Sequence, residues 1–239
     1  MMFSLPPGHR VYAIGDVHGM AHTLTELLAM IDAHMAAHPP EGPVVELFLG
    51  DYVDRGPDSY GVIQMLLGEP NGRQRVCLLG NHEDAMLSAL CDVDALHRWL
   101  SFGGEATCRS YGVDAVELLH DPLALQTRLQ AALPPAHRSF LSALPRQFAL
   151  GEVLFVHAGV RPDVALDAQD PHDLIWIRDP FLHHDGPLPM HIVHGHTPAE
   201  RPERTRYRTN VDTAAVYGGA LTAAVLEGSE ATFLSVPTV

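Results

Sequence analysis

The chain has 239 residues, of which 46% are hydrophobic and 18% charged, and this composition supplies enough apolar material for a sizeable globular core. The formal net charge of −14 argues against a nucleic-acid-binding protein, because covering a phosphate backbone requires a surplus of basic side chains. All 15 basic residues are arginine, so chemistry that needs a lysine, such as Schiff-base formation, is excluded.

The cysteines and the lengths of the uncharged stretches indicate the cellular compartment. Three cysteines in a chain of this length do not suggest a disulfide framework. The stretches without charged residues are shorter than the ~20 residues that a membrane-spanning helix needs. The first residues also lack the apolar run of a signal peptide. We therefore expect a cytoplasmic protein that makes no contact with a membrane.

Strand-like and helix-like segments alternate up to Gly80, which is typical of an α/β domain. Each strand-like run is apolar and β-branched and ends at a glycine that opens a polar loop. These runs predict strands at residues 10–14, 44–49 and 76–79.

Two helices are expected between these strands. The first has an apolar stripe from Leu24 to Met35, follows a capping-box pattern at residues 23–26, and must end before Pro39. Ser59 is expected to cap the second helix.

The middle of the chain is predicted to be helical. Residues 84–144 are rich in Ala and Leu and contain no strand-like run of useful length, so we expect a helical insertion there. Strand signals return after Arg146, at residues 153–156, 174–177, 192–193, 211, 221–225 and 232–236. No linker divides the chain, which predicts a single domain over residues 1–239.

Polar loops stand among these apolar segments. Five loops carry charged or imidazole side chains: GDVHG at residues 15–19, GDYVDRG at 50–56, GNHE at 80–83, HAG at 157–159 and HGHT at 194–197. Ligands of open α/β sheets bind beyond the carboxyl ends of strands, and charged groups are costly to bury unpaired. One such loop alone would most often be a solvated surface loop. Three of them after three successive strands indicate a ligand site.

The residue types in these loops favour a metal site. Asp16 and His18 are two residues apart, so an extended segment points both side chains the same way. Carboxylates, an amide and imidazoles without a thiolate suit manganese, iron, zinc or cobalt better than a structural zinc site. A carboxylate such as Asp51 can bridge two ions, and such a pair activates water for hydrolysis.

Together the loops resemble the signature of the phosphoprotein-phosphatase family of metallophosphoesterases, which reads GDxHG, GDxxDRG and GNHE, followed by two separate histidines. Residues 103–112 are similar to the bacterial and bacteriophage branch of this family. The resemblance implies an α/β fold with four layers, in which two mixed sheets pack face to face between outer helices. Ala214 stands where the family usually has glycine, which predicts a different backbone approach there.

The resemblance also implies a dinuclear metal centre. The first ion would be held by Asp16, His18 and Asp51, and Asp51 would bridge to a second ion held by Asn81, His157 and His196. The pattern favours His196 over His194, the other histidine of the fifth loop, as the ligand. Manganese is expected in vitro, with iron, zinc, cobalt and nickel as alternatives. Asp212 is given no role.

Four further residues would carry out the reaction. The resemblance implies that His82 is the general acid toward the leaving oxygen and that Asp54 orients its imidazole. Arg55 and Arg178 would bind the phosphoryl oxygens, because a guanidinium matches two of them at once. The nucleophile would be a hydroxide held by the two metal ions, which attacks phosphorus in line.

Three functions are compatible with this site. The expected function is a serine/threonine protein phosphatase that acts on phosphorylated proteins or peptides and on small phosphate esters. The alternative is a symmetrical diadenosine tetraphosphate hydrolase, whose second and third motifs usually read GDLVARG and GNHD, so Asp54 and Glu83 favour the phosphatase. A non-catalytic metal-binding regulatory module ranks last, because it would be expected to lack a ligand or the acid.

Overall fold

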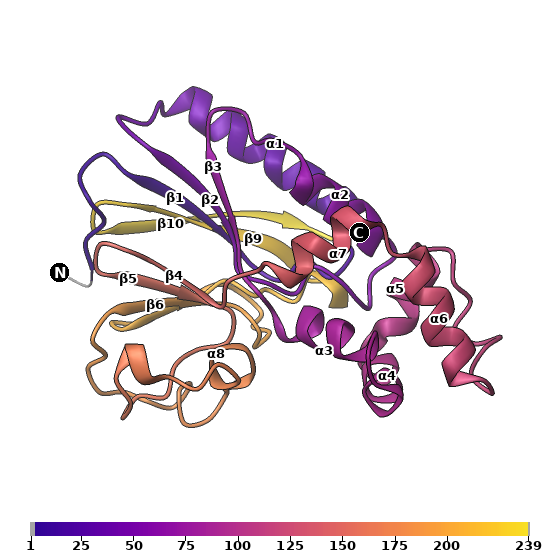
Figure 1. The fold of residues 1–239 in the computed structure, drawn as a ribbon. Coiled ribbons are helices and arrows are strands. Elements are labelled where there is room, and N and C mark those ends of the chain that lie inside the picture. Colours follow the sequence, from indigo (N-terminus) through magenta and orange to yellow (C-terminus); the bar gives the residue numbers. More distant parts are fainter. Residues whose placement is uncertain (1–2, 239) are drawn as a thin grey trace.

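Two five-stranded mixed sheets face each other at the centre of the computed structural model, which describes residues 3–238 (Figure 1). The first sheet has the order β10-β9-β1-β2-β3 and consists of β1 (Arg10–Ile14), β2 (Val44–Phe48), β3 (Gln74–Cys77), β9 (Ala220–Glu227) and β10 (Glu230–Pro237). The second has the order β4-β5-β6-β8-β7 and consists of β4 (Gln147–Leu150), β5 (Val153–Val156), β6 (His191–His194), β7 (Glu203–Arg204) and β8 (Arg208–Asn210).

Parallel strands carry the ends of several segments to one edge of each sheet. In the first sheet β1, β2 and β3 are parallel, and Ile14 pairs with Phe48, which pairs with Cys77. In the second sheet β5, β6 and β8 are parallel. Because parallel strands end at the same edge, the loops that follow them begin side by side.

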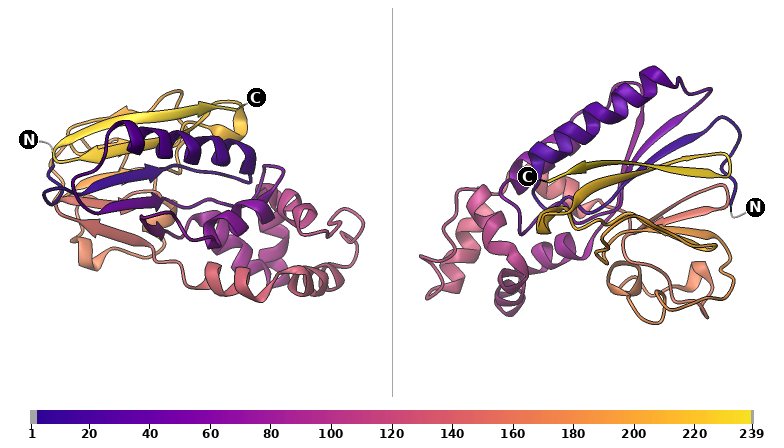
Figure 2. Two further views of the ribbon diagram at one scale, coloured as in Figure 1. Left: turned by 90° about the horizontal axis from the view of Figure 1, so that it is seen from above. Right: turned by 180° about the vertical axis from the view of Figure 1, so that it is seen from behind.

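Helices cover the outer faces of the two sheets (Figures 1 and 2). Leu24, Leu27 and Ile31 of α1 (Ala21–Ala37) pack with the outer face of the first sheet, together with α2 (Ser59–Leu67). The short helix α8 (Asp173–Trp176) packs its Leu174 and Ile175 on the second sheet. The four layers implied by the resemblance are therefore present.

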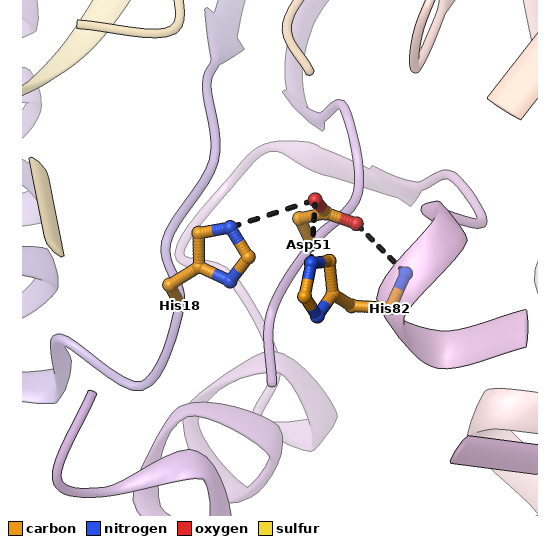
Figure 3. A group of neighbouring side chains, drawn as sticks. All are labelled: His18, Asp51 and His82. Atoms are coloured by element: carbon orange, nitrogen blue, oxygen red, sulfur yellow. Dashed lines mark hydrogen bonds and ion pairs between the residues drawn. The ribbon is translucent and has the colours of Figure 1, made fainter. Parts of the chain in front are cut away.

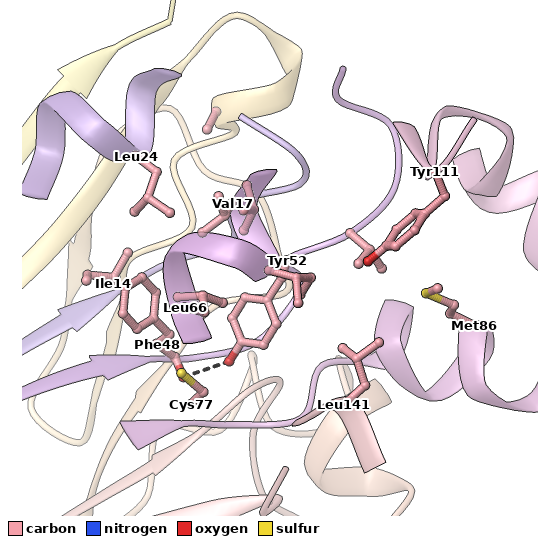
Figure 4. Close-up of a cluster of buried hydrophobic side chains, with 14 of the residues drawn as sticks. Ile14, Val17, Leu24, Phe48, Tyr52, Leu66, Cys77, Met86, Tyr111 and Leu141 are labelled. Carbon is pink, nitrogen blue, oxygen red and sulfur yellow. Dashed lines mark hydrogen bonds between the residues drawn. The ribbon is translucent and has the colours of Figure 1, made fainter. Parts of the chain in front are cut away.

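Strand β1 shows why the runs of the first half are apolar at consecutive positions. Its Val11 and Ala13 pack between the sheets, in one cluster with Phe155 of β5. Its Tyr12 and Ile14 lie in the opposite cluster, toward the helices. Figure 4 shows Ile14 in this cluster with Leu24 of α1. A strand buried on both faces has a continuous rather than an alternating apolar pattern.

The described residues between β3 and β4 form helices and turns and no strand, as the composition predicts. The helices are α3 (Asn81–Ala89), α4 (Val93–Trp99), the π-helical turn η1 (Leu100–Gly104), α5 (Glu105–Ser110), α6 (Pro122–Ala132) and α7 (Pro135–Ser142). In the part of the chain that the structure covers, no helix combines the length and the apolar character that crossing a membrane requires.

Two strand predictions are wrong. Residues 174–177 were expected to be a strand but belong mostly to helix α8, because a short apolar run fits a buried helical turn as well as a strand. Val211 lies just beyond β8, although its N–H still donates to the carbonyl of His194. Strands β4, β7 and β8 were not predicted, because β4 is only half-buried and β7 and β8 consist of polar residues.

Both predicted helix caps are also wrong. Helix α1 starts at Ala21 without a side-chain cap, because the chain turns into the helix directly after the first loop, where Met20 N–H donates to the carbonyl of Val17. Asp58 caps α2 by accepting a hydrogen bond from Gly61 N–H at 2.7 Å. Ser59 is instead the first helical residue, and its hydroxyl accepts from Asp54 N–H.

Candidate metal centre and active site

The five polar loops meet at one edge of the two sheets. The first two are joined by hydrogen bonds from Val17 and His18 N–H to the carbonyl of Asp51, at 3.0 and 2.8 Å. The fifth loop joins the fourth through Gly195 N–H, which donates to the carbonyl of His157. A cavity of about 250 Å³ opens between the loops. It is lined by eight of the ten predicted site residues, and the other two, Asp54 and His157, are completely buried behind them.

Two groups of possible metal ligands share Asp51. In the first, the Asp51 carboxylate lies 3.5 Å from His18 Nε2 and 3.9 Å from His82 Nε2 (Figure 3). In the second, it lies 3.3 Å from His157 Nε2, and His196 is the third member. A carboxylate common to both groups is in the position that a bridging ligand requires.

Asn81 lies within the second group. Its Oδ1 is 2.9 Å from both His157 Nε2 and His196 Nδ1. His157 Nδ1 donates to the carbonyl of Leu49 at 3.1 Å, so its Nε2 carries a lone pair rather than a proton. An imidazole lone pair, an amide oxygen and a carboxylate oxygen thus converge as acceptors, an arrangement that a cation satisfies.

The charges of the site also fit metal ions. Burial and the carboxylates of Asp212 and Asp51 raise the pKa of Asp16, and burial raises the pKa of Asp212 to about 6. Burial lowers the pKa of His18 to about 3 and that of His196 to about 2, which leaves both imidazoles neutral. Clustered carboxylates beside neutral imidazoles need positive charge, and two divalent cations would supply it.

Asp16 stands at the side of the two groups rather than inside them. Both of its carboxylate oxygens accept from His196 N–H at 3.1 Å, and its side chain forms part of the cavity wall. His194 turns away from the cavity: it is buried beside Phe181, and its Nδ1 donates to the carbonyl of Gly195. The fold therefore brings His196 rather than His194 to the candidate ligands.

Several residues of these loops have an unusual backbone conformation. Among the residues that the structure describes, the non-glycine residues with positive φ are His18, Asp51, Asp54, Arg55, His196 and Ala214, with φ from 44° to 75°. All six contribute to the cavity or lie directly behind it. Such strain is retained where surrounding contacts fix a functional geometry. Ala214 has a left-handed conformation, which glycine adopts more easily than alanine.

His82 and Asp54 form a buried pair. His82 Nδ1 lies 2.7 Å from Asp54 Oδ2, which also accepts from Trp99 Nε1 at 2.8 Å. Asp54 Oδ1 accepts from the Thr107 hydroxyl at 2.6 Å. Burial alone would lower the pKa of His82, but the carboxylates of Asp51 and Asp54 outweigh it and leave this pKa raised. The imidazole is thus oriented through Nδ1, with Nε2 directed toward Asp51.

Two arginines place positive charge at the cavity. Arg55 Nη1 donates to His18 Nε2 at 2.5 Å, and the backbone N–H of Arg55 donates to the carbonyl of Gly103. Arg178 Nη2 donates to the carbonyl of His196 at 3.3 Å. Their guanidinium groups match the chemistry of phosphoryl oxygens.

Several residues that build the site were not predicted from the sequence. Asp212 was given no role, yet it lines the cavity beside Asp16, and a buried aspartate after an apolar segment is the signal that could have found it. Trp99 comes from the helical insertion and lies in no motif, and Thr107 lies in the segment 103–112 that carries the resemblance but was assigned no role. Glu83 was predicted only to distinguish the phosphatase motif GNHE from the hydrolase motif GNHD, without a structural role. Its carboxylate accepts from the N–H groups of Asp51, Tyr52, Val53 and Gly80, at 2.7 to 3.2 Å.

Comparisons with known proteins agree with this geometry. A model of the calcineurin-like phosphoesterase family matches residues 9–220. Two relatives are named asymmetrical bis(5′-nucleosyl)-tetraphosphatase PrpE. The chain is 26% identical to the one from Halalkalibacterium halodurans, covering 94% of this chain and 92% of the relative. It is 28% identical to the one from Geobacillus thermodenitrificans, covering 94% and 93%. A crystal structure provisionally named a diadenosine tetraphosphatase is similar in fold, with a TM-score of 0.68, 23% identity and 99% of both chains covered.

Proposed function

Because the chain belongs to the calcineurin-like phosphoesterase family, we propose that it is a metal-dependent hydrolase that cleaves bis(5′-nucleosyl) tetraphosphates asymmetrically. The observation that carries the proposal is the agreement of relatives that cover 94% of this chain and are named for this activity. The dinucleotide alternative thus replaces the protein phosphatase as the main hypothesis, with asymmetrical instead of symmetrical cleavage.

The two residues that favoured a protein phosphatase have roles that do not depend on the substrate. Asp54 holds the imidazole of His82, and Glu83 joins the second and third loops through backbone N–H groups. Either role serves any phosphate ester or anhydride. Asp54 and Glu83 therefore do not determine which group of the substrate is bonded to the phosphorus that reacts.

The metal ions of this hydrolase would be held by the predicted ligands Asp16, His18, Asp51, Asn81, His157 and His196. Divalent ions bound there would lower the pKa of water and supply a nucleophile at neutral pH. We propose manganese as the ion that supports activity in vitro, with iron, zinc, cobalt or nickel as alternatives.

The side chains of this protein would perform the remaining steps. Arg55 and Arg178 bind the phosphate oxygens and offset the charge that grows on them. Water adds its oxygen to phosphorus, and the P–O bond to the leaving phosphate breaks. His82 donates a proton from Nε2 to the leaving oxygen, while Asp54 accepts from Nδ1 and keeps the ring in place.

Product analysis tests this proposal. Purified protein with manganese is incubated with diadenosine tetraphosphate, and nucleotides are separated by anion exchange. The proposal expects equal amounts of AMP and ATP. ADP as the sole product would show symmetrical cleavage and contradict it. Phosphoserine, phosphothreonine and phosphotyrosine peptides are assayed in parallel, and a marked preference for any of them over the dinucleotide would restore the protein phosphatase.

A further inference from the structure

Three aromatic side chains surround the mouth of the cavity, and no catalytic role uses them. They are Phe102, Trp176 and Tyr217, which come from the turn η1, from α8 and from the turn η3 (Ala215–Tyr217). Tyr217 is 62% exposed and Phe102 is 39% exposed. Large rings exposed beside a charged cavity are more typical of a binding surface than of a core. We call these three residues the aromatic rim.

Two rings of the rim, Phe102 and Trp176, pack against neighbouring rings. The Phe102 and Trp176 centroids are 6.0 Å apart with planes at 61°, an edge-to-face contact. Trp176 also stacks on His172, at 5.9 Å and 15°. Phe102 and Trp176 therefore each have a neighbouring ring that limits their motion, which reduces the entropy lost when a ligand binds.

Arg55 connects the two sides of the rim. Its backbone N–H donates to the carbonyl of Gly103, the residue after Phe102. Its guanidinium carbon lies 5.5 Å from the centre of the Tyr217 ring. A group bonded to a phosphate that Arg55 binds would accordingly lie in the cavity that Phe102 and Tyr217 both line.

We infer that the aromatic rim binds a nucleobase of the substrate, with Tyr217 and Phe102 as the stacking surfaces and Trp176 supporting Phe102. This inference rests on the proposed function and names the part of the substrate that the metal centre does not touch. A flat ring joined to a polyanion matches aromatic side chains placed beside Arg55 and Arg178. Stacking on an aromatic side chain strengthens binding by roughly 5- to 150-fold per base.

The fluorescence of Trp176 offers a direct test. The other tryptophan, Trp99, is completely buried, whereas Trp176 lies at the rim. The full chain with manganese is titrated with ATP and with inorganic tripolyphosphate, which has a similar charge but no base. We expect ATP to bind at least fivefold more tightly than tripolyphosphate and to quench Trp176. Equal affinities, or no binding of ATP, would overturn the inference.

Substitutions at Tyr217 assign the effect to the ring. Tyr217→Ala should bring the ATP-to-tripolyphosphate affinity ratio close to one, and Tyr217→Phe should keep the wild-type ratio. Tyr207→Ala is the matched control, because Arg206 lies 5.4 Å over the Tyr207 ring in the same way but outside the cavity. An unchanged ratio in Tyr217→Ala would contradict the stacking role.

Kinetics separate this inference from the proposed function. If the dinucleotide is cleaved, Tyr217→Ala should raise the KM for the dinucleotide more than it raises the KM for tripolyphosphate. The two fold-changes should differ by a factor of at least five. If the dinucleotide is not cleaved but ATP still binds through Tyr217, the proposed function fails and the base site stands. If Tyr217→Ala weakens only phosphotyrosine-peptide binding, the rim receives a peptide and the inference is wrong.

Discussion

Ala214 occupies a backbone conformation that glycine adopts more easily. Its φ of 60° lies in the left-handed region, which costs a residue with a Cβ about 1–2 kcal/mol. The loop is held there by hydrogen bonds, since Ala214 N–H donates to Asp212 and the Ala214 carbonyl accepts from Gly219 N–H. The contacts of Asp212 therefore outweigh the local preference of alanine.

Ala214→Gly should raise the free energy of unfolding by about 0.5–1 kcal/mol, because relief of the strain exceeds the entropy that glycine adds to the unfolded chain. The control is Ala29→Gly in the exposed middle of α1, where the same change should cost about 1 kcal/mol. Urea unfolding of both variants gives the comparison. Equal destabilisation by both would show that position 214 is not strained.

The role of His82 depends on its hydrogen bond to Asp54. His82→Asn should lower turnover of alkyl phosphate esters by about 10²–10⁴-fold, and that of p-nitrophenyl phosphate much less, because a good leaving group needs little protonation. Metal content by mass spectrometry should stay unchanged. Since His82 Nε2 also lies within one candidate ligand group, loss of a metal ion would make His82 a ligand and refute the acid role.

At the scale of elements, Glu83 joins the start of α3 to the loop after β2. One carboxylate oxygen accepts from Asp51 and Gly80 N–H, and the other accepts from Tyr52 and Val53 N–H. The strained loop that carries Asp51 is thereby attached to the helix that carries Asn81 and His82. The position of Asp51, the candidate bridging ligand, therefore depends on this attachment as much as on strand β2.

Glu83→Gln tests this attachment. Whichever oxygen becomes an amide nitrogen, two buried N–H donors lose their acceptor, so the free energy of unfolding should fall by about 1–3 kcal/mol for each unsatisfied group. The exposed Glu69→Gln should change it by less than about 0.5 kcal/mol. If the two variants melt at the same temperature, Glu83 does not hold the loops together.

The sequence predicts the strands that coincide with continuous apolar runs and misses the polar or half-buried ones. The parallel strands β1, β2 and β3 of the first sheet follow from apolar runs that end at glycine, and their observed ends differ from the predicted ones by at most two residues. The run at 174–177 has the same character but forms a helical turn, in which Ile177 N–H donates to the carbonyl of Asp173. Periodicity cannot separate the two over four residues.

The site is predictable to the extent that motifs mark it. Five loops with unusual polar residues point to the metal groups around Asp51, and the structure brings these loops together. The aromatic rim has no such signal, because Phe102, Trp176 and Tyr217 come from three segments that meet only after folding. The support of Asp54 by Trp99 likewise depends on how the helical insertion packs.

At the scale of the whole molecule, the candidate metal centre lies where the two sheets meet. Asp51 and Asn81 follow strands of the first sheet, whereas His157 and His196 follow strands of the second. Ligands from two sheets link metal binding to the packing between them. Removing the metal ions with a chelator should therefore lower the melting temperature, and adding manganese should restore it. A melting temperature that changes neither with the chelator nor with manganese would contradict this link.

The number of metal ions per chain, measured after manganese loading, tests the account most directly. We expect two ions in the wild-type protein and in the exposed control Asp163→Asn, and loss of both ions in Asp51→Asn, because Asp51 is common to both ligand groups. A wild-type protein that hydrolyses phosphate compounds without metal, or an Asp51→Asn variant that keeps two ions, would contradict it.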